Sequence, residues 1–249
     1  MIGMLIWKEP GKREKAVAVK ERSILRVRFW CAEVQRGPRT PEAVLRRRVA
    51  AAGKRLRKQG VTRVVLPEGF AYGQQLEKWD QHPVSTQGLR RAIAADWVRW
   101  LLMEQGTPTA GARVAVSAER LTGEVVRTVT ELSLRHRYVL LDLPRGGEDL
   151  CRQLRREYGV SLLMGPSREQ LEGADVLVLF APREDLRPGG VTLALYEGGG
   201  EELPELLLPP ALEEQLPEGC CRGQLLAALR EAGAIRAGQI TAAVEKTAV

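Results

Sequence analysis

The sequence predicts an α/β protein in which a parallel sheet with crossover helices follows a smaller lobe that contains β-strands. The first observation is a regular alternation of apolar strand-like segments and amphipathic helices between residues 113 and 196. The second is a group of three strand-like segments within the first 34 residues. Strands that alternate with helices of this length indicate parallel pairing with right-handed crossovers.

Residues 1–110 form the expected N-terminal α+β lobe. Thr40 is the predicted N-cap of its first helix, and Gly60 follows the last turn of that helix. The boundary to the next lobe is placed in the loop at residues 107–111. The predicted elements are three strands, a helix, a short strand and a second helix, at residues 4–7, 16–19, 24–34, 41–59, 62–67 and 87–105.

Residues 111–249 form the second expected lobe, a parallel sheet with a helical C-terminal tail. If the sheet is parallel, the carboxyl ends of strands 113–117, 138–143 and 175–181 point the same way and border one crevice, where ligands of open α/β sheets bind. The predicted strands are residues 113–117, 138–143, 160–164, 175–181 and 191–196, and the predicted helices are residues 122–134, 147–158, 167–172, 223–233 and 237–244.

The net charge of +7 is unevenly spread along the chain. Residues 1–110 carry 22 Lys and Arg against 10 Asp and Glu, whereas the remainder carries 16 against 21. Arg46, Arg47 and Arg48 lie on the predicted helix at 41–59 and could contact nucleic-acid phosphates. The sequence shows no helix-turn-helix or zinc-finger spacing, so a solvated helix face or pairing with the acidic lobe is favoured over nucleic acid.

The block from Arg113 to Pro182 resembles the NAD(P)-binding domain of dehydrogenases of the shikimate dehydrogenase and glutamyl-tRNA reductase type. The strand Arg113-Val-Ala-Val-Ser117 leads into a helix, and a second strand ends at Asp142, 25 residues after Ser117. In that family an acidic residue near this position binds the ribose hydroxyls. Gly173-Ala-Asp-Val-Leu-Val-Leu-Phe-Ala-Pro182 resembles the family's fourth strand, after which residues lie over the cofactor. The resemblance implies a Rossmann-like parallel sheet.

The sequence departs from that family at the phosphate loop. A pyrophosphate needs glycines that bring backbone N–H groups close to it at a helix start. The loop here is Ser117-Ala-Glu-Arg-Leu-Thr-Gly123, and Glu119 and Glu124 would repel a pyrophosphate. Arg120 could offset this repulsion, while Thr122 has the alternative role of an N-cap. The candidate cofactor-binding residues are Ser117, Arg120, Thr122, Gly123, Asp142 and Pro182.

Other residue types that carry chemistry are sparse. His82 precedes a helix, and His136 is expected to be exposed at a strand edge. Cys220 and Cys221 precede a helix, where a thiol pKa can fall, but no base lies near them in the sequence and structural roles are favoured. The spacing of the cysteines matches no zinc site and no disulfide framework, which indicates a cytoplasmic location. The first seven residues are interpreted as a strand, not a signal peptide.

Three functions remain open from the sequence. The favoured one is a Rossmann-like protein without catalysis that binds a nucleotide, another small ligand or a protein partner at the crevice. The second is an NAD(P)-dependent oxidoreductase with a divergent phosphate loop. The third is nucleic-acid binding through the basic N-terminal lobe. No membrane association and no metal site are expected.

Overall fold

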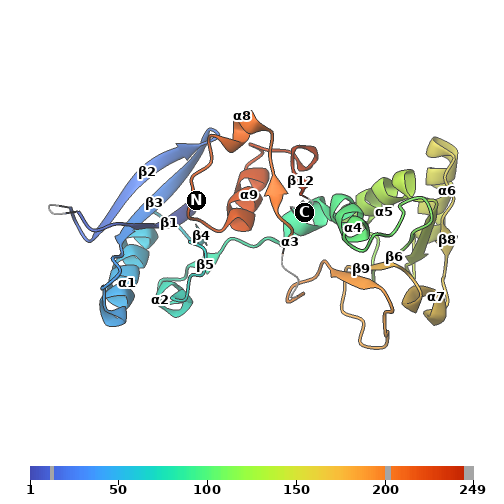
Figure 1. Ribbon diagram of the computed structural model, residues 1–249, viewed down its shortest axis with the longest axis horizontal. Coiled ribbons are helices and arrows are strands. Elements are labelled where there is room, and N and C mark those ends of the chain that lie inside the picture. The colour runs from blue at the N-terminus through green and yellow to red at the C-terminus, as the bar shows by residue number, and fades with distance from the viewer. Residues whose placement is uncertain (12–13, 200–202, 244–249) are drawn as a thin grey trace. The chain divides into compact units, whose positions relative to one another are not determined.

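The computed structural model describes residues 1–11, 14–199 and 203–243, which form two compact units (Figure 1). Of these described residues, unit 1 comprises those within 1–89 and 208–239, and unit 2 comprises those within 90–207 and 240–243. The division thus differs from the expected boundary at residue 110, because residues 90–110 pack with unit 2 and most of the tail packs with unit 1. The N–H of Cys221 donates to the carbonyl of Leu66 at 2.7 Å, and Gln224 accepts from the Leu66 N–H at 2.8 Å.

A mixed five-stranded sheet in the order β2-β3-β1-β4-β5 forms the centre of unit 1. β1 runs parallel to β3 and β4, whereas β2 and β3 form an antiparallel hairpin. Leu25 and Arg26 turn this hairpin with φ values of 46° and 67°. The continuous strand expected at 24–34 is therefore wrong at its start, because the alternation of side chains continues through a turn that lacks the usual Asn or Gly. The strands are β1 (Ile2–Lys8), β2 (Val17–Ile24), β3 (Val27–Gln35), β4 (Arg63–Val65) and β5 (His82–Pro83).

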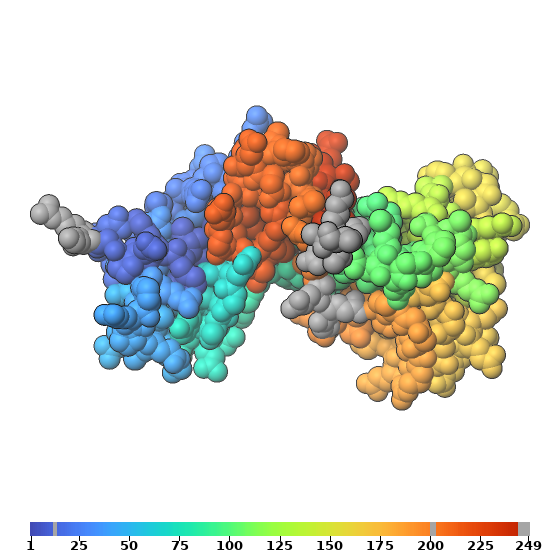
Figure 2. Space-filling model, in the orientation of Figure 1, coloured from blue at the N-terminus to red at the C-terminus, as the bar shows by residue number. Residues whose placement is uncertain are grey.

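Helix α1 (Glu42–Lys58) covers this sheet with the apolar stripe that the sequence predicts, and Leu45, Val49 and Leu56 are buried. Its N-cap is Pro41, because the Thr40 hydroxyl instead accepts the Gly37 N–H at 2.9 Å. Figure 2 shows the tail of unit 1, in orange, directly beside its blue and cyan residues. The remaining helices of unit 1 are α2 (Gly73–Glu77), α8 (Pro210–Glu213), α9 (Arg222–Glu231) and a 3-10 turn (Ala237–Gln239). The helix expected at 237–244 is wrong, because residues 237–239 form only a 3-10 turn and residues 241–242 form a strand, while residue 244 lies outside the described residues.

Unit 2 contains a fully parallel five-stranded sheet in the order β10-β9-β6-β7-β8. The predicted common direction of strands 113–117, 138–143 and 175–181 is confirmed. The register pairs Ser117 with Asp142 on one side and with Leu179 on the other. The strands are β6 (Arg113–Ser117), β7 (Tyr138–Asp142), β8 (Leu163–Met164), β9 (Val176–Leu179) and β10 (Val191–Ala194).

Crossover helices lie on both faces of this sheet, α5 and α6 on one and the short α7 on the other (Figure 1). The helix expected at 87–105 is interrupted at Ile93. Ala115, Leu177 and Leu171 share a buried cluster on the α7 face. The helices of unit 2 are α4 (Ala94–Glu104), α5 (Gly123–Arg135), α6 (Gly147–Tyr158) and α7 (Arg168–Glu172), and β11 (Leu206–Leu207) pairs with β12 (Thr241–Ala242). Helix α3 (Gln87–Ala92) contains the boundary between residues 89 and 90.

The hydropathy of the helices gives one further result. Within the described ranges, no helix is both long enough and apolar enough to cross a membrane.

Candidate functional site

Three polar side chains meet at the carboxyl ends of β6, β7 and β9. The parallel register places Ser117 opposite Asp142, and the Ser117 hydroxyl donates to the Asp142 carboxylate at 2.8 Å. Arg183, from the loop after β9, donates to the Ser117 hydroxyl at 2.9 Å and also to the Asp142 carboxylate. We call Ser117, Asp142 and Arg183 the edge network. Its residues come from the ends of β6 and β7 and from the loop after β9, and only the parallel order of these three strands brings them together.

The loop after β9 holds Arg183 in place through a second carboxylate. Asp185 accepts from the Arg183 guanidinium at 2.7 and 2.9 Å. These hydrogen bonds lower the pKa of Asp185 to about 2 and, together with the one that Arg183 donates to Asp142, raise the pKa of Arg183. The Arg183 side chain is 31% exposed and that of Asp142 is 27% exposed, so solvent screens their ion pair and limits it to about 1 kcal/mol.

The segment that follows β6 does not form a phosphate cradle. The Thr122 side chain accepts the Val125 N–H at 3.3 Å and so caps α5. Gly123 begins α5 in a place where an added Cβ would meet nothing within 4 Å. A glycine at this position is therefore not needed to let the helix pack closely on the sheet. Glu124 is paired with Arg91 at 2.7 Å and keeps a negative charge in the first turn of α5.

A small cavity of about 180 Å³ lies beside this segment. Arg120, Arg91 and Phe180 line it, and the Arg91 guanidinium lies 5.7 Å from the centre of the Phe180 ring. Arg120 is exposed and makes no ion pair with any residue that the structure describes. The cavity is smaller than the roughly 300–1,000 Å³ usual for ligand pockets, so it could hold one small polar group and not a dinucleotide.

Five of the six candidate residues thus fall into two groups. Ser117 and Asp142 are joined in the edge network, while Arg120, Thr122 and Gly123 surround the start of α5. Pro182 is exposed in the loop after β9 and immediately precedes Arg183. Sequence reasoning missed Arg183, and the only signal for it was a closely spaced Arg and Asp directly after a buried strand.

The residues at this edge do not fit NAD(P) as they stand. In the fold family an acidic residue at the end of the second strand accepts the ribose hydroxyls. Here Asp142 already accepts hydrogen bonds from Ser117 and Arg183. The glycine-lined approach to a pyrophosphate is also missing, since the loop carries Glu119, Arg120 and Leu121. We therefore assign no step of a hydride transfer to this edge.

The remaining candidates for chemistry lie elsewhere. His136 is buried, so the exposed position expected for it is wrong; it follows α5 and packs in the interior before β7. Burial raises the pKa of the Cys220 thiol to about 11, which keeps it protonated at neutral pH and supports a structural role. His82 is exposed, 3.5 Å from Asp80. Across residues 1–11, 14–199 and 203–243, no group of three or more His, Cys, Asp or Glu side chains could hold a metal ion.

The pH dependence of stability tests the burial of His136. Burial, with a smaller contribution from the Arg135 charge, lowers the pKa of His136 below that of a free histidine. The unfolded chain therefore binds a proton near pH 6.5 while the folded chain does not, so stability is lost as the pH falls below about 6.5. Denaturation at pH 7 and pH 5 should show this loss.

Two variants separate His136 from other titrating groups. His136→Leu should reduce the loss between pH 7 and pH 5, whereas His82→Gln, at an exposed position, should leave it unchanged. An identical pH dependence in His136→Leu and the wild type would show that His136 is not the group responsible.

The basic helix α1 uses two of its three candidate arginines inside unit 1. Arg46 pairs with Glu42 at 2.5 Å, and Arg48 donates to the Gln35 carbonyl at 2.5 Å. Arg47 is exposed. Two of the three candidate arginines of α1 are therefore held by contacts within unit 1.

Comparison with known proteins finds only distant structural similarities. No protein-family model and no curated protein sequence matches the chain. A dipicolinate synthase subunit from Bacillus halodurans is 18% identical, with a TM-score of 0.36, over 70% of this chain and 67% of that one. Shikimate 5-dehydrogenase from Listeria monocytogenes is 12% identical, with a TM-score of 0.34, over 81% of this chain and 80% of that one.

A probable ornithine cyclodeaminase from Bordetella pertussis is 17% identical, with a TM-score of 0.33. The match covers 44% of this chain and 36% of that one, so this chain spans about a third of its length. Likenesses of this size carry no argument about activity. The parallel order β9-β6-β7-β8, with its crossover helices, is what makes residues 113–182 a Rossmann-like segment.

Proposed function

We propose that unit 2 binds a small ligand of the nucleotide class at the carboxyl edge of its sheet and carries out no redox chemistry there. The observation that supports this most directly is the edge network, in which polar side chains meet at the carboxyl edge of the sheet, where ligands of open α/β sheets bind. Asp142 is the residue there best placed to accept ribose hydroxyls, and a ligand that does so displaces its partly exposed pair with Arg183. The four cysteines are unpaired, which is consistent with a reducing compartment such as the cytoplasm.

Two features oppose the binding of a dinucleotide, the ion pair of Arg183 with Asp142 and the missing phosphate cradle, and their free energies differ. The partly exposed pair of Arg183 and Asp142 is worth about 1 kcal/mol, so a ligand could displace it. The missing phosphate cradle is the larger deficit, because each lost hydrogen bond to a charged group costs about 1.5–3 kcal/mol. A ligand with one anionic group that Arg120 can reach fits this edge better than a pyrophosphate does.

The oxidoreductase alternative is favoured by one specific observation. Asp142 ends the strand next to β6, where the fold family places its ribose-binding acid. If Arg183 swung away, Asp142 could accept ribose hydroxyls and Arg120 could contact a phosphate. This alternative therefore predicts that NAD or NADP binds.

Thermal-shift titration with NAD, NADP, ATP and S-adenosylmethionine separates the two. A ligand that binds only the folded state raises the melting temperature by mass action. We expect S-adenosylmethionine, whose one anionic group is a carboxylate, to raise it at about 1 mM, and Arg120→Ala to remove that shift. ATP, NAD and NADP, which all carry linked phosphates, should produce none. The matched control is Arg152→Ala, an exposed arginine on α6.

Removing Arg183 tests the role of the edge network. Arg183→Ala should cost about 1 kcal/mol of stability and strengthen binding of any ligand with a ribose, because Asp142 is freed. A clear shift of the wild type by NAD or NADP would favour the oxidoreductase alternative. The absence of a shift with all four ligands would rule out nucleotide binding at this edge.

A further inference from the structure

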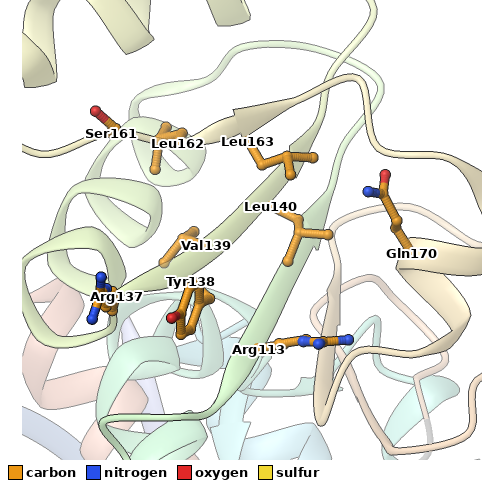
Figure 3. A pocket seen from close by; sticks show the side chains of 9 residues that line it. All are labelled: Arg113, Arg137, Tyr138, Val139, Leu140, Ser161, Leu162, Leu163 and Gln170. Carbon is orange, nitrogen blue, oxygen red and sulfur yellow. The ribbon is translucent and has the colours of Figure 1, made fainter.

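A second hollow lies at the opposite end of the same sheet. It has a volume of about 600 Å³ and lies at the amino ends of β6 and β7 and along the edge strand β8 (Figure 3). Arg113 and Tyr138 are the first residues of β6 and β7, whereas Ser117 and Asp142 of the edge network are the last. The hollow is therefore separate from the site proposed above.

The parallel register determines which side chains form its floor. Arg113 pairs with Tyr138, and Leu140 pairs with Leu163, so these four side chains project from one face of the sheet. Figure 3 shows Leu140 and Leu163 beside each other, with Gln170 of α7 facing them. The Arg113 guanidinium extends along the same face toward α7.

The hollow is open because the helix on this face is short. α7 has five residues, and its Leu171 reaches the buried cluster around Ala115 and Leu177. It leaves the outer strands uncovered, so that Tyr138 is 47% exposed and Leu163 is 45% exposed. Exposed apolar surface of this kind, in a concave place, is typical of a binding site.

The charge of the lining is one-sided. Arg113 and Arg137 line the hollow, and none of the described residues that line it is acidic. Neither guanidinium forms an ion pair with another described residue; that of Arg137 lies 5.5 Å from the centre of the Tyr138 ring. Two unpaired cations beside apolar side chains favour a ligand that is apolar and anionic at once.

We propose that this hollow binds an amphipathic organic anion. The apolar body of the ligand would lie on Leu140 and Leu163, and the carboxylate of the ligand would accept hydrogen bonds from Arg113. The Gln170 amide lines the same hollow. The size of the hollow lies within the range of small-ligand pockets, which is roughly 300–1,000 Å³. A nucleotide is not the expected occupant, because the floor of the hollow is aliphatic and no carboxylate among the described residues lines it that could accept ribose hydroxyls. The neutral polar side chains of the lining are those of Tyr138, Ser161 and Gln170.

Octanoate is a suitable probe, and octyltrimethylammonium and octan-1-ol are its cationic and neutral counterparts. Amide chemical shifts of the full chain should move on titration with octanoate, with the largest changes at Arg113, Tyr138 and Leu163. We expect a dissociation constant below about 1 mM for octanoate and at least tenfold weaker binding of the other two compounds.

Variants then test the two halves of the proposal. Arg113→Gln should weaken octanoate binding about tenfold and leave octan-1-ol unaffected. Leu163→Gln, at a half-exposed position, should weaken both compounds. Arg152→Gln removes an exposed arginine from α6 of the same unit and should change neither.

Several results would overturn the proposal. These are no binding of octanoate up to about 5 mM, equal binding of all three compounds, and equal octanoate affinity in Arg113→Gln and the wild type. Shifts confined to Ser117, Asp142 and Arg183 would place octanoate at the edge network and would also exclude the hollow. Because the nucleotide titrations monitor that edge, failure of one proposal leaves the other standing.

Discussion

Replacing Leu177 by alanine should lower the free energy of unfolding by about 2–5 kcal/mol, the range found when a buried leucine is truncated. Leu177 is fully buried in β9, where it pairs with Ala115 of β6 and Thr192 of β10. It also belongs to the cluster that holds α7 on the sheet. The truncation therefore removes apolar contacts from an interior strand of the sheet on which the candidate site depends. Urea denaturation followed by circular dichroism would measure the loss.

Leu163→Ala is the matched control for this change. Leu163 lies in the same sheet but is 45% exposed at the edge strand β8. Its truncation should cost less than about 1 kcal/mol, because much of its surface is already in water. The protein has two compact units, and these need not unfold together. The unfolding transition of unit 2 must therefore be measured separately from that of unit 1. Equal losses in the two variants would contradict the placement of β9 in the interior of the sheet and of β8 at its edge.

Gly190→Ala should be the second strongly destabilising change. Gly190 immediately precedes β10, and a Cβ there would fall well inside van der Waals contact with the carbonyl oxygens of Ala174 and Asp175. Backbone atoms cannot rotate away as a side chain can, so β10 must shift. The Val191 N–H donates to the Asp175 carbonyl at 3.0 Å, and this bond would be lost or stretched. We expect a cost of about 1–3 kcal/mol or more, as for other overpacked sites.

Hydrogen exchange localises this effect. The amides of β10 should lose protection in Gly190→Ala, while those of β6 and β7 are less affected. Gly111→Ala is the control, because a Cβ at that position meets no atom within 4 Å. A Gly190→Ala protein as stable as Gly111→Ala would show that β10 approaches residues 174–175 less closely than described.

The sequence alone determined that the strands of unit 2 run parallel, because strand and helix periodicities are local and alternate regularly from Arg113 onward. It thereby placed Ser117 and Asp142 at the carboxyl ends of strands that border one crevice, and the register of the structure decided that the two side chains meet. The apolar stripe of α1 was predictable for the same reason. The degenerate phosphate loop was also visible, since it is defined by residues that are neighbours in the chain.

Only the tertiary structure decided the features that depend on distant partners. The tail packs on unit 1 through Cys221, Gln224 and Leu66, and nothing in its local pattern names those partners. Arg183 reaches Asp142 across β6, a contact between residues 41 positions apart. His136 is buried because α5 and β7 meet around it, although its arginine neighbours in sequence suggested exposure. Periodicity specifies which face of an element is apolar, whereas the identity of the surface that covers that face depends on long-range packing.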